Sequence, residues 1–265
     1  MTVRPRVIPC LLVHRGGLVK TIQFDSPKYV GDPLNAVRIF NEKAADELMV
    51  LDIDATTERR EPRYELIAAL ARECRMPLCY GGGVSSADQV ERIVSLGVEK
   101  VAIGSAAFSV PSLIESGADR VGSQSIAVVM DIRSDPVTGA AAAYSHRATR
   151  RVEGSVESLA LRAARSGAGE IVLNSVDRDG TMQGYDTAIV SAVRATVDLP
   201  ITAVGGAGSL EQMLALVEAH PGVAAAAGSL FVFKGKYRAV LIQYPTRDQR
   251  AGTRGTSPNG GVPAP

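Results

Sequence analysis

A glycine-rich stretch that occurs twice at the same spacing limits the possible folds of this chain more than any other feature. Each copy joins a run of glycines to a Gly-Ser pair 23 residues after the first glycine of the run: Gly81-Gly82-Gly83 with Gly104-Ser105, and Gly205-Gly206 with Gly228-Ser229. Between these ends, each copy has a serine (Ser85 or Ser209), apolar residues at helical spacing, and a short apolar segment typical of a strand. A duplicated unit of this kind predicts a fold built from two similar half-barrels.

The repeated glycines are candidates for holding an anion. Glycine lets the backbone approach a ligand closely and turn its N–H groups toward a phosphate, and a helix that starts nearby adds its dipole. Alternatively, these glycines only form tight turns between strand and helix. For one copy the two interpretations are about equal, but two copies at the same spacing favour ligand binding.

Composition narrows the class of protein. The chain has 265 residues, of which 46% are hydrophobic, so it is long enough to bury one large core. Its net charge is +1 without a block of either sign, so neither nucleic acid nor a charged membrane is an expected partner. It has no secretory leader and no apolar run of about 18 residues, which favours a cytoplasmic protein. The three cysteines lack metal-ligand spacing, so we expect buried thiols and neither a metal nor a cofactor.

Strands and helices are predicted to alternate up to residue 245. The main strands are expected at Val7–Val13, Leu48–Ile53, Leu78–Tyr80, Lys100–Ile103, Ser125–Ile132, Glu170–Val176, Ile201–Val204 and Val223–Ala227. Eight such units in two sets of four predict an α/β fold of the (βα)8 TIM-barrel type over residues 1–245. An open doubly wound sheet fits less well because G-x-G-x-x-G is absent after the first strand. Residues 246–265 are rich in Arg, Gly, Pro, Ser and Thr, which predicts a disordered tail.

Local signals add detail between the strands. Asp32 and Pro33 predict the start of a helix, because an aspartate can cap it and proline suits its first turn. Ser26-Pro27 is expected in a loop, and a short fourth helix is expected near Pro111–Glu115. An excursion from Arg133 to Arg150 is expected to carry a minor strand at Ala140–Tyr144.

In a barrel of this type, the carboxyl ends of the strands form the active face. The candidates that this rule places there are Leu12, Asp52, Gly82, Gly104, Asp131, Asn174, Asp179, Gly205 and Gly228. Four charged residues stand at the opposite, amino ends of strands: Arg6, Glu47, Lys100 and Glu170. By themselves they predict a layer of salt bridges that closes the floor of the barrel. A functional role would require something that passes through the barrel.

Six motifs carry a resemblance to a known family: Ile8-Pro-Cys-Leu, Leu51-Asp-Ile-Asp-Ala, Gly81-Gly-Gly, Ser175-Val-Asp-Arg-Asp-Gly-Thr181, Gly184-Tyr-Asp186 and Gly205-Gly-Ala-Gly208. Together they resemble the HisF family, the cyclase subunit of imidazole glycerol phosphate synthase, over roughly residues 4–233. The resemblance implies a (βα)8 barrel that binds a substrate with two phosphates, one per half. It also implies ammonia delivered by a glutaminase docked on the opposite face, through a charged gate that matches Arg6, Glu47, Lys100 and Glu170.

The resemblance also assigns the phosphate-binding residues. One site matches Gly82, Gly83, Gly104 and Ser105, and the other matches Asp179, Gly180, Gly205, Gly206, Gly228 and Ser229. The first site departs from the family, which usually has Asn-Thr where this chain has Gly104-Ser105. Backbone donors survive that change, whereas a side-chain amide does not. Lys20 matches the lysine of the family's mobile loop, which could clamp an anion; the alternative is a solvated loop lysine.

The first strand departs from the family where its chemistry is expected. The family's cyclase uses two aspartates, at the ends of strands one and five, as general acid and general base. Asp131 matches the strand-five member, but Leu12 occupies the strand-one position. Loss of a positioned acid or base typically costs about a hundred- to ten-thousand-fold in rate, so the standard cyclase reaction is doubtful for this chain.

Further motifs resemble a divergent HisF branch associated with glycosyl amidation: Gly17-Leu-Val-Lys-Thr, Tyr29-Val-Gly-Asp-Pro, Ile39-Phe-Asn-Glu-Lys and the segment 233–245. This resemblance implies a HisH-like glutaminase and a sugar amidotransferase as partners, which convert an acetamido sugar into an acetamidino sugar for surface polysaccharide. Two alternatives stay open. One is a histidine-pathway cyclase in which His14 or Asp52 replaces the missing acid, and the other is a non-catalytic scaffold that activates a glutaminase.

The other polar residues are expected either to stabilise loops or to be exposed to solvent. His14 is expected to be a solvated loop residue, and His146 is expected at the surface. Asp177 and Asp179 occupy alternate positions, whose side chains point apart along a strand. We expect Asp179 to face the ligand and Asp177 to hold its loop.

Overall fold

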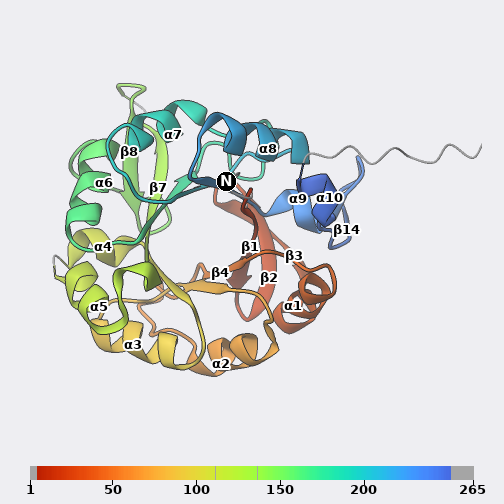
Figure 1. The fold of residues 1–265 in the computed structure, drawn as a ribbon, viewed down its shortest axis with the longest axis horizontal. Coiled ribbons are helices and arrows are strands. Elements are labelled where there is room, and N and C mark those ends of the chain that lie inside the picture. Colours follow the sequence, from red (N-terminus) through yellow and green to blue (C-terminus); the bar gives the residue numbers. More distant parts are fainter. Residues whose placement is uncertain (1–4, 111, 136, 252–265) are drawn as a thin grey trace, which may run out of the picture.

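The structure is a computed structural model that describes residues 5–110, 112–135 and 137–251. Its centre is a closed barrel of eight parallel strands surrounded by helices (Figure 1). In order around the barrel, the strands are β1 (Val7–His14), β4 (Leu48–Asp52), β5 (Leu78–Gly81), β6 (Lys100–Ile103), β7 (Ile126–Ser134), β10 (Glu170–Ser175), β11 (Ile201–Val204) and β12 (Val223–Ala227). β12 pairs with β1, which closes the sheet and confirms the predicted (βα)8 barrel.

Helices cover the outside of the barrel between consecutive strands. They are α1 (Pro33–Glu42), α2 (Tyr64–Glu73), α3 (Ala87–Ser95), α4 (Ser105–Ser109), α5 (Leu113–Val121), the 3-10 helix η1 (Ser123–Ser125), α6 (Val156–Arg165), α7 (Thr187–Arg194), α8 (Leu210–Ala219) and α9 (Ser229–Val232). The side chain of Asp32 caps α1 by accepting from the backbone N–H of Asn35, as predicted. The fourth helix is longer than expected and is divided into α4 and α5.

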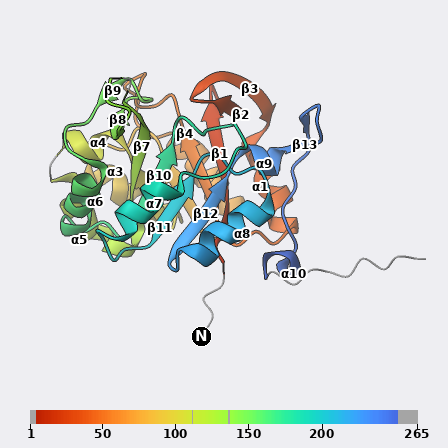
Figure 2. The same cartoon turned by 90° about the horizontal axis from the view of Figure 1, so that it is seen from above.

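Three hairpins lie outside the closed sheet: β2 (Gly17–Ile22) with β3 (Asp25–Gly31), β8 (Ala141–Ser145) with β9 (Arg150–Arg151), and β13 (Phe233–Lys234) with β14 (Ala239–Val240). The first two extend β1 and β7 beyond the barrel and rise on the same side of the molecule (Figure 2). Ser26-Pro27 lies in β3, not in the predicted loop. β3 is an edge strand whose pairing with β2 is irregular, so the missing N–H of Pro27 is tolerated.

Apolar side chains form two layers of core. The larger layer lies between strands and helices, and a smaller cluster fills the barrel interior with Ile8, Cys10, Met49, Cys79, Ala102, Ala127, Val129, Val172, Ala224 and Ala226. Cys10 and Cys79 are buried free thiols, as predicted, whereas Cys74 is only partly buried. Burial raises the pKa of Cys10 to about 11, so this thiol stays protonated and unreactive at neutral pH.

At the first end of each repeat, the two half-barrels correspond with a shift of one residue from the sequence register, whereas Gly104 and Gly228 both directly precede a helix without a shift. Gly82, not Gly81, adopts the positive φ that Gly205 adopts, with values of 122° and 94°. Likewise Ser86, not Ser85, caps α3 as Ser209 caps α8. Gly81 is the last residue of β5 and has a strand conformation, although the sequence repeat aligns it with Gly205, which has a positive φ.

The segment that follows the barrel begins with ordered structure. Thr246 caps the short helix α10 (Arg247–Arg250), and the buried Arg250 pairs with Asp46 at 2.9 Å. The prediction that disorder starts at residue 246 is therefore wrong for residues 246–251, because these contacts bind them to the floor end of β4. The rest of the predicted tail, 252–265, lies outside the described residues. Throughout the described part of the chain, no helix is both long and apolar enough to cross a membrane.

Candidate functional site

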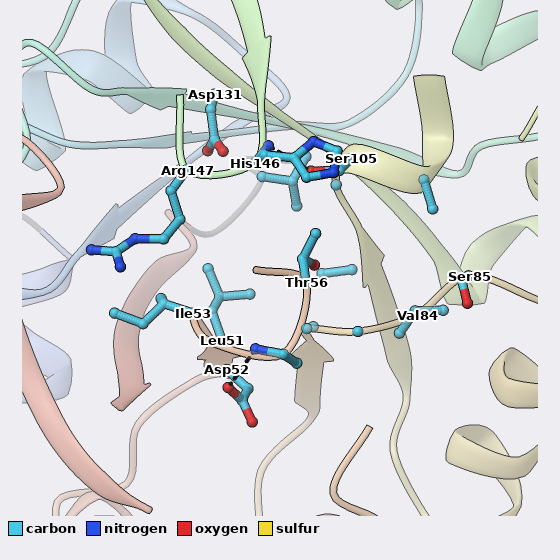
Figure 3. A pocket seen from close by; sticks show the side chains of 18 of the residues that line it. Leu51, Asp52, Ile53, Thr56, Val84, Ser85, Ser105, Asp131, His146 and Arg147 are labelled. Atoms are coloured by element: carbon cyan, nitrogen blue, oxygen red, sulfur yellow. Dashed lines mark hydrogen bonds between the residues drawn. The ribbon is translucent and has the colours of Figure 1, made fainter. Parts of the chain in front are cut away.

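A cavity of about 510 Å³ opens at the carboxyl ends of the barrel strands (Figure 3). We call it the large cavity. It brings together the residues predicted for the first phosphate site, here called the first cradle: Gly82, Gly83, Gly104 and Ser105. Leu12, Asp131 and Asn174 line the same cavity. The structure thus places a candidate anion site and the candidate catalytic aspartate around one space.

A second, small cavity of about 40 Å³ adjoins the first. The residues predicted for the second phosphate site, here called the second cradle, line it together with Lys20: Asp179, Gly180, Gly205, Gly206, Gly228 and Ser229. Leu12, Leu51 and Asn174 line both cavities. The two cradles therefore lie at one face of the barrel with Leu12 between them, although the space at the second cradle is much smaller.

Asp131 lies near the end of β7 and points into the large cavity (Figure 3). Parallel pairing of β7 with β10 places Asn174 beside it, and the Asn174 amide donates to the Asp131 carboxylate at 2.9 Å. Burial raises the pKa of Asp131 to about 7; the hydrogen bond from Asn174 lowers it and the charge of Asp179 raises it. At neutral pH this carboxyl can therefore either accept or donate a proton.

The residues considered as substitutes for an acid at Leu12 are engaged elsewhere. Asp52 is 4% exposed and accepts hydrogen bonds from the backbone N–H groups of Asp54 and Ala55 at 3.1 and 3.2 Å. Arg60 also pairs with Asp52 at 3.2 Å. Asp52 lies on the opposite side of the cavity from Asp131 (Figure 3). Asp52 lines the large cavity, and its contacts also make it a support of the loop after β4.

His14 is not the solvated loop residue that the sequence suggested. It ends β1, and its Nδ1 lies 2.7 Å from a carboxylate oxygen of the buried Asp54. Burial alone would raise the pKa of Asp54, but hydrogen bonds from the Arg15 backbone and from His14 hold that pKa below its usual value. His14 lines neither cavity, so its contact with Asp54 stabilises the loop after β4 and does not place it beside Asp131.

Lys20 is buried within β2, so a solvated loop lysine is excluded. Its ammonium donates to the carbonyl of Cys10 and lies beside the position that a side chain at Gly228 would occupy. Burial lowers the pKa of Lys20, while the charge of Asp179 favours the protonated form. A cation in this position suits an anionic group in the second cradle.

Asp179 has a structural role in addition to its place beside the small cavity. Its Oδ2 accepts from the hydroxyl of Thr21 at 2.6 Å and from the backbone N–H of Phe24 at 3.2 Å. Asp177 accepts from the backbone N–H of Ser134 at 2.7 Å. Asp177 therefore holds its loop as expected, and Asp179 also attaches the β2–β3 hairpin to the loop after β10.

The four charged residues at the floor form a closed ring of alternating sign. Arg6 contacts Glu47 and Glu170 at 2.7 and 3.1 Å, and Lys100 contacts the same two carboxylates at 3.2 and 2.8 Å. Burial alone would raise the pKa of Glu170, but Arg6 and Lys100 outweigh it and hold that pKa below its usual value. Thr202 adds a hydrogen bond to Glu170 at 2.5 Å. The ring closes the floor as the predicted salt-bridge layer would.

Two residues of the large cavity were missed by the sequence analysis. His146 and Arg147 line it from the turn between β8 and β9, next to Ser105 (Figure 3). The backbone N–H of His146 donates to the Ser105 hydroxyl at 2.9 Å, so this turn does not project into solvent as predicted. The excursion was recognised in the sequence, but its contact with the barrel mouth depends on the long-range pairing of β8 with β7.

Comparison with known proteins agrees with the family resemblance found in the sequence. A model of the family described as "Histidine biosynthesis protein" matches residues 6–238. Pseudomonas aeruginosa has a relative provisionally named imidazole glycerol phosphate synthase subunit hisF2, which is 52% identical over 243 residues, 92% of this chain and 96% of the relative. A provisionally named HisF subunit of Leptospira borgpetersenii is 50% identical over 91% of this chain and 95% of its own length. The HisF subunit of imidazole glycerol phosphate synthase from Geobacillus thermodenitrificans is 38% identical over 89% and 95%, respectively.

Proposed function

The chain belongs to the HisF family of histidine biosynthesis proteins, and from this premise we propose that it is the barrel subunit of a glutamine-dependent ammonia-transfer complex. In this complex a HisH-like glutaminase releases ammonia at the floor, and the barrel passes it toward the active face. A sugar amidotransferase then uses it to convert an acetamido sugar into an acetamidino sugar for surface polysaccharide.

The observation that carries this proposal is that Asp131 lines the large cavity together with Leu12, which occupies the position of the second carboxylate in the family. The family's ring closure needs one group to donate a proton while another removes one. Leu12 cannot titrate, and Asp52 and His14 are held by other contacts away from Asp131. A single carboxylate can orient incoming ammonia by accepting a hydrogen bond from it, but it cannot act as acid and base together. This residue set supports ammonia handling better than ring closure.

The floor ring supports a controlled entrance for ammonia. Arg6 and Lys100 both bridge Glu47 and Glu170, so movement of one cation still leaves the carboxylates partly compensated. Between the ring and the mouth, the interior cluster includes four alanines, whose small side chains leave an apolar lining. An apolar lining suits neutral ammonia and disfavours ammonium, which would lose its hydration.

The names of the relatives also fit this proposal. Relatives at 50–52% identity have provisional names, two of which carry the copy numbers 2 and 3. Relatives with the plain subunit name are 38–39% identical. The greater similarity to relatives whose names are provisional is compatible with a role other than histidine biosynthesis.

A turnover measurement tests the proposal. Purified protein is given the bisphosphate substrate of the HisF cyclase with excess ammonium salt, in parallel with a Leu12→Asp variant. We expect no measurable ring closure by the natural chain and a gain of activity in Leu12→Asp, since both aspartates would then line the cavity. Turnover by the natural chain at the rate of a HisF cyclase would overturn the proposal.

A second candidate function is that of a histidine-pathway cyclase. It is favoured by the retention of both cradles at one face of the barrel, as a substrate with two phosphates requires. Growth of a histidine auxotroph lacking its own cyclase separates the two functions. Restored growth with the natural chain would support the cyclase, and growth restored only by Leu12→Asp would support ammonia transfer.

A further inference from the structure

Two hairpins from distant parts of the sequence meet across the mouth of the large cavity. Arg147, in the turn between β8 and β9, donates through Nη2 to the backbone carbonyl of Phe24, between β2 and β3, at 2.9 Å. Phe24 and Arg147 both line the cavity. The contact therefore joins the two hairpins at the point where a ligand would enter.

Both turns have a backbone conformation that is costly for residues other than glycine. His146, Arg147 and Ala148 have φ between 53° and 60°, and Gln23 and Phe24 have φ of 52° and 65°. Left-handed residues occur singly in most proteins, and runs of them persist where surrounding contacts impose them. Here the imposing contacts are the hydrogen bond of Arg147 to Phe24 and that of His146 to Ser105.

The charge of Arg147 is not neutralised by the protein. Among the described residues, Arg147 has no carboxylate partner, and its hydrogen bond is to a neutral carbonyl. Two arginines of the same excursion differ in this respect, since Arg151 pairs with Asp135 at 3.4 Å and Arg133 approaches Asp177 at 4.0 Å. A guanidinium has five N–H donors in a planar fork, so Arg147 keeps donors for a ligand while it holds Phe24.

The turn that carries Arg147 also contacts the first cradle, although the side chain of Arg147 extends away from Ser105, toward Phe24 (Figure 3). Its neighbour His146 donates to the Ser105 hydroxyl at 2.9 Å, so the turn is attached to the cradle itself. A Cβ built on Gly104 would meet nothing within 4 Å, so the space over this part of the cradle is open. Arg60 lines the same cavity, but Asp52 and Glu58 already pair with it.

We propose that Arg147 is an anion-binding residue of the large cavity, which contacts a phosphorylated ligand held by the first cradle and, by retaining its bond to Phe24, keeps the β2–β3 hairpin over that ligand. This inference goes beyond the proposed function and rests on the first cradle being a phosphate site, as the resemblance to the HisF family implies. A guanidinium bonded to both the phosphate and Phe24 makes ligand affinity and hairpin position interdependent. Arg147 is thus a determinant of specificity for an anionic over a neutral ligand.

Calorimetry with ribose 5-phosphate as the probe, and ribose as the neutral reference, tests the first part of this proposal. Arg147→Gln is compared with Arg150→Gln, a control in the same hairpin whose exposed side chain lines neither cavity. We expect Arg147→Gln to weaken binding by about tenfold and to reduce its salt dependence, with Arg150→Gln within about twofold of the natural chain. Repeating the comparison in a Lys20→Met background restricts binding to the first cradle.

Hydrogen exchange of residues 22–31 tests the second part. Ribose 5-phosphate should protect this hairpin in the natural chain and not in Arg147→Gln, whereas Arg147→Lys should recover part of the affinity without the protection. Equal affinities of Arg147→Gln and Arg150→Gln, or binding of ribose 5-phosphate no tighter than ribose, would overturn the inference. Neither measurement involves glutaminase or ammonia, so its outcome is independent of whether ammonia transfer or sugar amidation is established.

Discussion

The side-chain amide of Asn174 donates a 2.9 Å hydrogen bond to the carboxylate of Asp131, and the two residues are direct neighbours in the register of β10 and β7. Asn174 is 8% exposed, so this bond lies at the bottom of the cavity, where water competes little for it. Burial raises the pKa of this carboxyl, on which the proposed function depends, and the bond from Asn174 limits that rise. Two predictions concern it directly.

Replacing Asn174 by alanine should raise the pKa of Asp131 further above about 7. The amide bonds to the ionised carboxylate, so its removal disfavours the charged form, by roughly half to one pKa unit for a bond worth about 1 kcal/mol. Carbon-13 NMR of the Asp131 carboxyl, assigned with an Asp131→Asn sample, measures the change. Asn35→Ala, on the exposed side of α1, is the control. A pKa that falls or does not move would contradict the prediction.

Replacing Asp131 by asparagine should change how stability depends on pH. The pKa of Asp131 is about 7 in the folded protein, above the roughly 3.9 of an unfolded aspartate, so the folded state binds more protons between these values. The natural chain should therefore lose stability as pH rises from about 4 through about 7, and the variant should not. At pH 8 we expect the variant to be more stable by on the order of 2 kcal/mol, a figure reduced because water in the cavity screens the charge. Urea unfolding at pH 4 and pH 8 gives the comparison, and an equal pH dependence of both proteins would refute it.

Replacing Lys20 by methionine should separate stability from ligand binding. The buried ammonium has the Cys10 carbonyl as its hydrogen-bond acceptor, so an apolar side chain of similar length should leave the free protein at least as stable. Affinity for the bisphosphate cyclase substrate should fall by about tenfold or more, since the second cradle loses its cation. Lys28→Met is the control, because Lys28 pairs with Lys20 across the hairpin but is exposed. Unchanged affinity in Lys20→Met, measured by calorimetry, would show that the second cradle is not used.

Replacing Lys100 by alanine should uncouple ammonia delivery from chemistry at the mouth. In complex with its glutaminase, glutamine-dependent product formation should fall far more than ammonia-dependent formation, because the ring that guards the floor is broken. The free energy of unfolding should fall by about 2 to 3 kcal/mol, since Glu47 and Glu170 are left with Arg6 alone. Lys43→Ala, at an exposed position, controls for loss of charge. Equal losses with both nitrogen sources would argue for a purely structural ring.

Much of the architecture was predictable because its signals are local. Apolar periodicity and the glycine repeat indicated eight strand and helix units, and the rule for carboxyl ends of strands placed Asp131, Asn174 and both cradles on one face. The same rule placed Arg6, Glu47, Lys100 and Glu170 together at the floor, where they form the ring. These predictions held because strand direction alone determines which end of a barrel a residue occupies.

Other features depended on contacts that are far apart in sequence. The correspondence of Gly82 with Gly205 is defined by backbone conformation, which residue identity did not reveal. The burial of Lys20 follows from the pairing of β2 with β1, and the position of Arg147 follows from the pairing of β8 with β7.

The sequence by itself thus determined the barrel, the glycine turns of its two cradles and the presence of Leu12 where the family resemblance implies an acid, because each is a matter of residue type and order. Tertiary structure alone decided that Asp52 and His14 support a loop, that Asn174 holds Asp131, and that Arg147 joins two hairpins over the large cavity. Those roles depend on which side chains meet across the mouth of the barrel. Folding brings together side chains that are far apart in sequence, and the periodicity of the sequence does not indicate which of them will be in contact.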